Sequence, residues 1–212
     1  MIRFLTAGES HGPSLTAIVE GLPAGLAIDI DRLNLQMARR QKGFGSGGRM
    51  RIEKDAVRIT GGVMNGESTG APISIIISNK DYANWRDKDI APMTIPRPGH
   101  ADLTGAIKYR HSDLRLSLER ASARETAARV AVGALCAQFL SAAGITIGSY
   151  VLKIGDVEAD ISEALSFEER FRTAELNELR CPETSSAEKM REYIRLTMAA
   201  KDTAGGVFEV VA

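Results

Sequence analysis

Residues 73–78 read Ile-Ser-Ile-Ile-Ile-Ser, a strongly β-branched run. Because β-branched side chains favour the pleated, half-buried surface of a sheet, this run predicts a strand at the centre of a sheet. Short apolar runs that precede it in the sequence, over residues 2–6, 15–22 and 57–60, predict further strands. The first part of the chain is therefore expected to form a sheet that contains residues 73–78.

Helices and additional strands are predicted farther along the chain. A helix capped by Asp31 is expected to end at Arg39-Arg40. An alanine-rich helix is expected from a capping box at residues 122–125 to Ala143, since Gly144 follows. A second capping box at residues 185–188 predicts another helix, and strands are predicted over residues 145–154 and 206–211.

Composition limits the classes of partner. The chain of 212 residues carries 27 basic and 27 acidic side chains, so no overall charge attracts nucleic acid or an anionic membrane. The N-terminal residues lack the pattern of a signal peptide, and no apolar run reaches membrane-spanning length. Cys136 and Cys181 match neither a C-x-x-C nor a zinc pattern. A cytoplasmic protein with reduced thiols is expected, with no metal, nucleic-acid or membrane partner.

The stretch Gly8-Glu9-Ser10-His11-Gly12 satisfies the G-x-S-x-G pattern of a hydrolase nucleophile elbow. That elbow requires a preceding strand and loop and a following helix, which supply the oxyanion hole. Only seven residues precede the motif, and a proline and β-branched residues follow it. A serine hydrolase is therefore the disfavoured interpretation.

Histidines and arginines offer a different interpretation of the same loop. His11 and His100 lie in glycine-flanked loops, where a histidine is accessible and titrates near neutrality, whereas His111 is expected to be structural. Arginines gather in separate clusters beside glycine, proline or a predicted helix start, and arginine binds phosphate or carboxylate bidentately. The clusters contain Arg39, Arg40, Arg49, Arg97, Arg120 and Arg124. Such clusters predict a ligand with several anionic groups.

Three motifs together resemble one family, the chorismate synthases. They are GESHG at residues 8–12, RPGHAD at residues 97–102 and RASARETAARVAVGA at residues 120–134. The resemblance extends over essentially the whole chain. It implies a lyase that eliminates phosphate from 5-enolpyruvylshikimate 3-phosphate, with loss of a ring hydrogen, to give chorismate. Reduced FMN is the implied cofactor, with NADPH as a candidate reductant.

The resemblance also implies roles for individual residues. His11 would assist the departing phosphate, and His100 would protonate or hydrogen-bond the reduced flavin. Substrate would be held by Ser10, Arg39, Arg49, Arg97 and Arg124. Cofactor would be held by Arg40, Ser46, Arg120, Ala121 and Ser122, with Ser46 standing where many relatives carry an arginine.

The implied fold is α+β, a β-α-β sandwich with helices between two sheets, usually assembled as a homotetramer. Residues 1–212 are expected to form a single domain, the N-terminal part of a longer chain, because the sequence stops inside an apolar strand. Such a piece is expected to be partly folded and catalytically silent. The alternative interpretation is a non-catalytic module that binds a phosphorylated metabolite or RNA at residues 43–48, although Phe44 is the only aromatic residue there.

Overall fold

The computed structural model describes residues 1–45 and 55–212 and contains two compact units. Among the described residues, the first unit comprises 1–41 and 55–142, and the second comprises 42–45 and 143–212. Each unit is described separately below. The expectation of a single domain remains a prediction.

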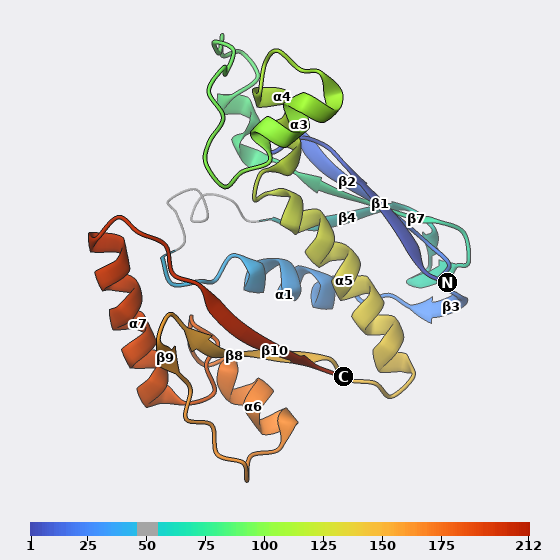
Figure 1. The fold of residues 1–212 in the computed structure, drawn as a ribbon. Helices are drawn as coiled ribbons and strands as arrows, with labels where there is room; N and C mark the ends of the chain where they lie inside the picture. Colours follow the sequence, from blue (N-terminus) through green and yellow to red (C-terminus); the bar gives the residue numbers. More distant parts are fainter. Residues whose placement is uncertain (46–54) are drawn as a thin grey trace. The chain divides into compact units, whose positions relative to one another are not determined.

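A four-stranded antiparallel sheet forms the base of the first unit (Figure 1). Its strands are β1 (Arg3–Ala7), β2 (Ser14–Glu20), β7 (Ile73–Ser78) and β4 (Val57–Gly61), in that order across the sheet. Strand β7 lies between β2 and β4, and alternate side chains of β7 are buried. The predicted central strand is therefore confirmed over residues 73–78.

Two helices pack on this sheet and enclose the main core. Helix α1 (Ile30–Arg40) packs against α5 (Glu125–Ala142), and α5 contacts β1, β2 and β7. Small side chains on α5 allow this close approach, because Ala127, Ala128 and Ala131 are completely buried. Large core side chains complete the packing, among them Leu15, Leu33, Met37, Ile75 and Leu135.

The three predicted helices are present as α1, α5 and α7 (Thr184–Ala199), but their caps differ from the predicted ones. Helix α1 is capped by Asp29, whose side chain accepts from the N–H groups of Asp31 and Arg32, so the predicted Asp31 cap is wrong by two residues. In the predicted capping box at residues 122–125, the Glu125 carboxylate instead accepts from Thr6. At Glu125 a side chain from elsewhere in the fold has displaced the local interaction, whereas at α1 the cap is a neighbouring residue.

Smaller elements complete the first unit. Strands β3 (Ala24–Ala27), β6 (Glu67–Thr69) and β5 (Val63–Met64) form a second sheet in that order. A 3-10 helix, η1 (Lys80–Asn84), follows β7. Two short helices follow, α3 (Asp102–Tyr109) and α4 (Arg115–Ala121), and Figure 1 shows them near the N-terminal end of α5.

The second unit contains a three-stranded antiparallel sheet and two helices. Its strands are β10 (Gly206–Val211), β8 (Gly148–Ile154) and β9 (Val157–Glu158), in that order, and its helices are α6 (Phe167–Ala174) and α7 (Thr184–Ala199). Strand β10 has the predicted bounds, whereas β8 begins three residues later than predicted. Glu183, and not the predicted Ser185, caps α7 by accepting from the N–H groups of Ser185 and Ser186.

Antiparallel sheets and separate helices give the chain an α+β architecture, which confirms the predicted class. Within residues 1–45 and 55–212, no helix is both long enough and apolar enough to cross a bilayer.

Candidate functional site

The loop between β1 and β2 carries Ser10 and His11, and its backbone is fixed from β7. Asn79, directly after β7, donates through its side-chain amide to the carbonyl of Gly12 at 2.8 Å, and its backbone N–H donates to Pro13 at 2.9 Å. Gly8 has a φ of 110°, and a Cβ there would lie 2.5 Å from the carbonyl oxygen of Ser14. The loop therefore requires glycine at position 8 and has a defined shape.

The surroundings of Ser10 do not form a nucleophile elbow. The serine lies in a turn between two antiparallel strands, and β2 follows it where the elbow requires a helix. Its backbone N–H donates to the carbonyl of Glu119 at 2.9 Å. This geometry agrees with the serine hydrolase being the disfavoured interpretation of the sequence.

His11 is held on two sides. The Glu119 carboxylate lies 2.7 Å and 2.9 Å from Nδ1 of the ring through its two oxygens, and Oε2 also accepts from the backbone N–H of His11 at 2.9 Å. The Trp85 ring packs against the imidazole with centroids 3.9 Å apart. Trp85 is itself held, because its indole N–H donates to Asp81 at 2.7 Å. The predicted catalytic histidine thus has a fixed ring.

Arg120 directly follows Glu119 in the sequence, and its side chain joins α4 to β1 and α5. Its guanidinium donates to the carbonyl and the hydroxyl of Thr6, both at 2.8 Å, and forms an ion pair with Glu125. The Thr6 hydroxyl donates to Glu125 at 2.6 Å. Because 42% of the Arg120 side chain remains exposed, the guanidinium is both oriented and accessible.

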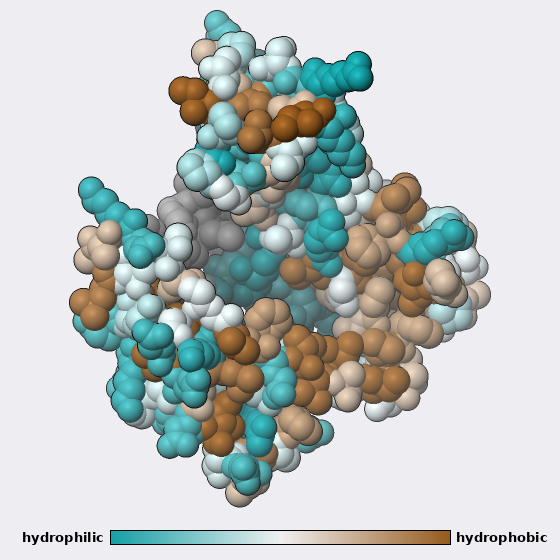
Figure 2. Space-filling view, in the orientation of Figure 1, coloured by the Kyte–Doolittle hydropathy of each residue, from teal (hydrophilic) through white to brown (hydrophobic). Residues whose placement is uncertain are grey.

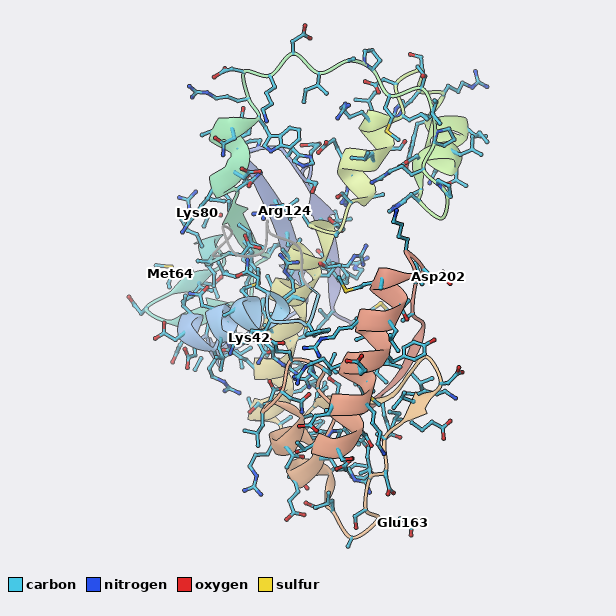
Figure 3. All side chains as sticks on the ribbon, turned by 90° about the vertical axis from the view of Figure 1, so that its left-hand side faces the viewer. Lys42, Met64, Lys80, Arg124, Glu163 and Asp202 are labelled. Carbon is cyan, nitrogen blue, oxygen red and sulfur yellow. The ribbon has the colours of Figure 1, made fainter. Side chains whose placement is uncertain are left out.

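Arg40 and Arg124 share one buried carboxylate. Asp55 accepts from Arg40 at 2.9 Å through Oδ2 and from Arg124 at 2.9 Å through Oδ1, and its side chain is 2% exposed. Arg124 also donates to the carbonyl of Ser78 at the end of β7; Figure 3 labels Arg124, which directly precedes α5. Residues predicted to bind different ligands, Arg40 and Arg124, are therefore held together.

The RPGHAD segment closes on itself through a bidentate ion pair. Arg97 donates from Nε and from an NH2 group to the Asp102 carboxylate at 2.9 Å and 3.0 Å, and its backbone N–H donates at 3.1 Å. The Asp102 side chain is fully buried. His100 is exposed between these two residues, and its backbone N–H donates to the Arg97 carbonyl. The pair fixes the loop that presents His100.

The Arg97–Asp102 pair also predicts a pH dependence of stability. Hydrogen bonds from Arg97 hold the pKa of Asp102 below its ordinary value. A carboxyl whose folded-state pKa is depressed contributes stability above its unfolded pKa of about 3.9, and that contribution is lost as the pH falls toward the folded-state pKa. We therefore expect Asp102→Asn to lose less stability on acidification than the unmodified protein. Urea unfolding from pH 6 to pH 2, roughly the span over which such carboxylates titrate, measures this.

The matched control for this experiment is Asp156→Asn, which removes a carboxyl from a turn in the second unit. Its pH dependence should follow that of the unmodified protein. Equal acid sensitivity of Asp102→Asn and the unmodified protein would contradict the assignment of acid-labile stability to this pair.

Helices α3 and α4 line a cavity of about 420 Å³. Gly105 permits their close approach, since a Cβ at this position would lie 2.3 Å from the Ser117 hydroxyl oxygen. Lys108 and Arg120 supply positive charge to the lining, and Tyr109, Leu116 and Ala121 supply apolar surface. Figure 2 shows apolar surface over this part of the molecule, to which the exposed Leu103, Ile107 and Leu116 contribute.

The remaining predicted site residues are placed as follows. Arg39, in the last turn of α1, donates to Gln36 at 2.9 Å. Ser122 follows α4 as its C-terminal cap, and its carbonyl accepts from the N–H of Glu125. Arg49 and Ser46 lie outside the described residues. His111 lines the cavity, with Nδ1 3.4 Å from the Ser117 hydroxyl and its ring stacked on Tyr109; its structural role remains a prediction.

Sequence reasoning missed the acids that organise these side chains. Glu119 holds His11, Asp55 holds two arginines, and Glu125 holds Arg120. The signal available for Glu119 was its position directly before the RASARE motif. Asp55 gave no such signal, because it is 69 residues from Arg124 in the sequence.

Comparison with known proteins agrees with the three motifs. The chorismate synthase family model matches residues 2–212. The chain belongs to the chorismate synthase family. Chorismate synthase of Sulfurihydrogenibium sp. (strain YO3AOP1) is 53% identical over 222 residues, and that of Aquifex aeolicus (strain VF5) is 49% identical over 230 residues, each match covering 100% of this chain.

A crystal structure of a chorismate synthase superposes on the chain with a TM-score of 0.80 at 42% identity and covers 99% of the chain. This likeness confirms the predicted fold type. The chain spans 57% of the length of that structure and of both curated relatives.

Proposed function

We propose that the protein is a chorismate synthase that converts 5-enolpyruvylshikimate 3-phosphate to chorismate and inorganic phosphate. In this elimination the ring C–O bond to phosphate breaks, a ring hydrogen is lost, and a second ring double bond forms. The observation that supports the proposal most strongly is the pairing of His11, on a loop of defined shape, with Glu119 of α4, next to Arg120. A proton donor and an anion-binding group are what the departure of a phosphate needs.

His11 is proposed to donate a proton to the departing phosphate. Imidazole is suited to this step because its ordinary pKa lies near neutrality. The Glu119 and Trp85 contacts keep the ring from rotating, so the proton donor is placed before the substrate arrives. Such preorganisation increases the reaction rate because little rotational freedom of the catalytic group remains to be lost in the transition state.

The arginines are proposed to divide two tasks. Arg97 and Arg120 expose 39% and 42% of their side chains, so they can meet a phosphate or carboxylate from solution. Arg124 is only 3% exposed and is hydrogen-bonded to Asp55. We therefore propose that it contributes to the positive electrostatic potential of the site. Arg39, Arg49 and Ser10 remain proposed substrate contacts.

The cavity beside Arg120 fits the proposed cofactor. Its volume of about 420 Å³ lies in the range of small-molecule sites, and its lining combines cations for a phosphate with apolar surface for a planar ring. Lys108 and Arg120 would hold the phosphate, Tyr109, Leu116 and Ala121 would face the ring system, and Ser122 adjoins them. When bound, reduced FMN would supply electron density to the substrate with no net redox change.

Other properties of the family remain proposals for this chain. His100 would hydrogen-bond the reduced flavin from the exposed loop between Arg97 and Asp102. Arg40 and Ser46 would contact NADPH if this nucleotide supplies the reducing equivalents. A homotetramer and a cytoplasmic location are proposed on the same ground.

The proposal is tested by product formation. Under anaerobic conditions with reduced FMN, a protein of the relatives' length that contains this chain is expected to form chorismate and phosphate from 5-enolpyruvylshikimate 3-phosphate, whereas residues 1–212 alone are expected to be catalytically silent. Binding of the substrate without any product would favour the non-catalytic binding module.

A further inference from the structure

Glu119 contacts the loop between β1 and β2, which carries the predicted catalytic His11, at three points. Its carboxylate approaches Nδ1 of His11 at 2.7 Å and 2.9 Å, the same group accepts from the His11 backbone N–H at 2.9 Å, and the Glu119 carbonyl accepts from the Ser10 N–H at 2.9 Å. The two sides of this contact are 108 residues apart in the sequence. Only 14% of the Glu119 side chain is exposed, so water competes weakly for these bonds.

The chemistry of this contact fixes the proton on one ring nitrogen. An ionised carboxylate only accepts hydrogen bonds, and neutral imidazole carries its proton on one nitrogen and a lone pair on the other. Nδ1 facing Glu119 must therefore carry the proton. We propose that Glu119 is a positioning residue that holds the Nδ1–H tautomer of His11 and leaves Nε2 as the nitrogen that exchanges a proton with the substrate. The exchange step rests on the proposed function, whereas the tautomer does not.

The substitution Glu119→Gln offers a sharp test because the backbone N–H of His11 can only donate. The glutamine oxygen would turn toward that N–H and place its NH2 group against Nδ1. An NH2 group only donates, so the shorter contact, 2.7 Å from Nδ1, favours an accepting Nδ1 and a proton on Nε2 over donation from Nδ1 to the oxygen at 2.9 Å. The charged ring, in which both nitrogens donate, would lose its partner at Nδ1. One substitution of nearly equal size should thus reverse the tautomer.

The experiment labels histidine with ¹⁵N and records the nitrogen shifts of both ring atoms by NMR over a pH titration. The chain has three histidines, and the His11 signals are assigned by their loss in His11→Asn. Above the titration of the ring, we expect His11 to be protonated at Nδ1 in the unmodified protein and at Nε2 in Glu119→Gln. The signals of His100 and His111 should not change, and Glu178→Gln, an exposed change in the second unit, should leave all three unchanged.

Kinetics supply the second readout. We expect Glu119→Gln to lower kcat by about 10- to 100-fold, less than the roughly 100- to 10,000-fold contribution of the proton-transfer group itself, with little change in KM. Protonation of neutral His11 at Nε2 in the unmodified protein would overturn the proposal even if the variant failed to fold. An unaltered tautomer in a folded Glu119→Gln, or an unaltered kcat with a reversed tautomer, would overturn it too. Absence of turnover in the unmodified protein would overturn the proposed function alone, and the tautomer would then decide the role of Glu119.

Discussion

Replacing His11 by alanine is expected to lower the rate of phosphate release by about two to four orders of magnitude, the usual contribution of a positioned acid or base. The reason for this large effect lies in the immediate surroundings of the His11 ring. The ring is held between Glu119 and Trp85, and no other histidine shares this loop. Stopped-flow or steady-state assays of phosphate release at saturating substrate and reduced FMN measure the effect.

His11→Asn is the matched variant for this measurement. Its side-chain amide can still donate to Glu119, so the loop keeps one of its bonds, but an amide does not exchange protons near neutral pH. Both variants should therefore lose turnover, while the asparagine variant should keep more of the stability of the unmodified protein. Arg58→Ala, on an exposed position of β4, should leave turnover unaltered. Turnover in His11→Asn within a few-fold of the unmodified protein would remove the histidine from the mechanism.

Replacing Asp55 by asparagine is expected to destabilise the protein by about 3 to 5 kcal/mol, the cost of removing one partner from a buried ion pair. Asp55 is the anion paired with both Arg40 and Arg124, whose side chains are 9% and 3% exposed. Neither guanidinium can lose its charge, because arginine stays protonated in proteins. Two cations would thus lose the carboxylate that they share in a poorly hydrated site. The free energy of unfolding in urea measures the cost.

A control for Asp55 is Asp87→Asn. Asp87 forms an ion pair with Arg86 at 2.8 Å, the same type of contact, but their side chains are 79% and 61% exposed. Water screens such pairs, so the substitution should leave the free energy of unfolding nearly unchanged. Equal small effects of the two substitutions would show that the Asp55 cluster is not a buried charge network.

The sequence predicted best those elements whose pattern is local and strong. Strands β7 and β10 have the predicted bounds, because each is a β-branched or apolar run that ends at a change in composition. The end of α5 was predicted to within one residue, since Gly144 follows and adopts a φ of 77°. Helices α3 and α4 were not predicted. Neither has a side-chain cap, and α3 contains Gly105, which serves packing rather than helix propensity.

The candidate site was predicted only in part, for a related physical reason. Histidine and arginine stood out because glycine and proline flank them in the sequence. Their acidic partners are far away along the chain, as with Thr6 and Glu125, which are 119 residues apart. A tertiary contact of this kind leaves no local pattern. The same contacts overrode local expectations for Glu125, which was predicted as part of a helix cap.

The measurement that tests the account most directly follows both products in one anaerobic reaction of the protein with 5-enolpyruvylshikimate 3-phosphate and reduced FMN. Phosphate is quantified by a coupled assay and chorismate by its absorbance after chromatography. The account predicts that the two products appear together in a one-to-one ratio, that both are absent without flavin, and that both rates fall in parallel in His11→Asn. Release of phosphate without chorismate, or equal rates in the unmodified protein and His11→Asn, would contradict it.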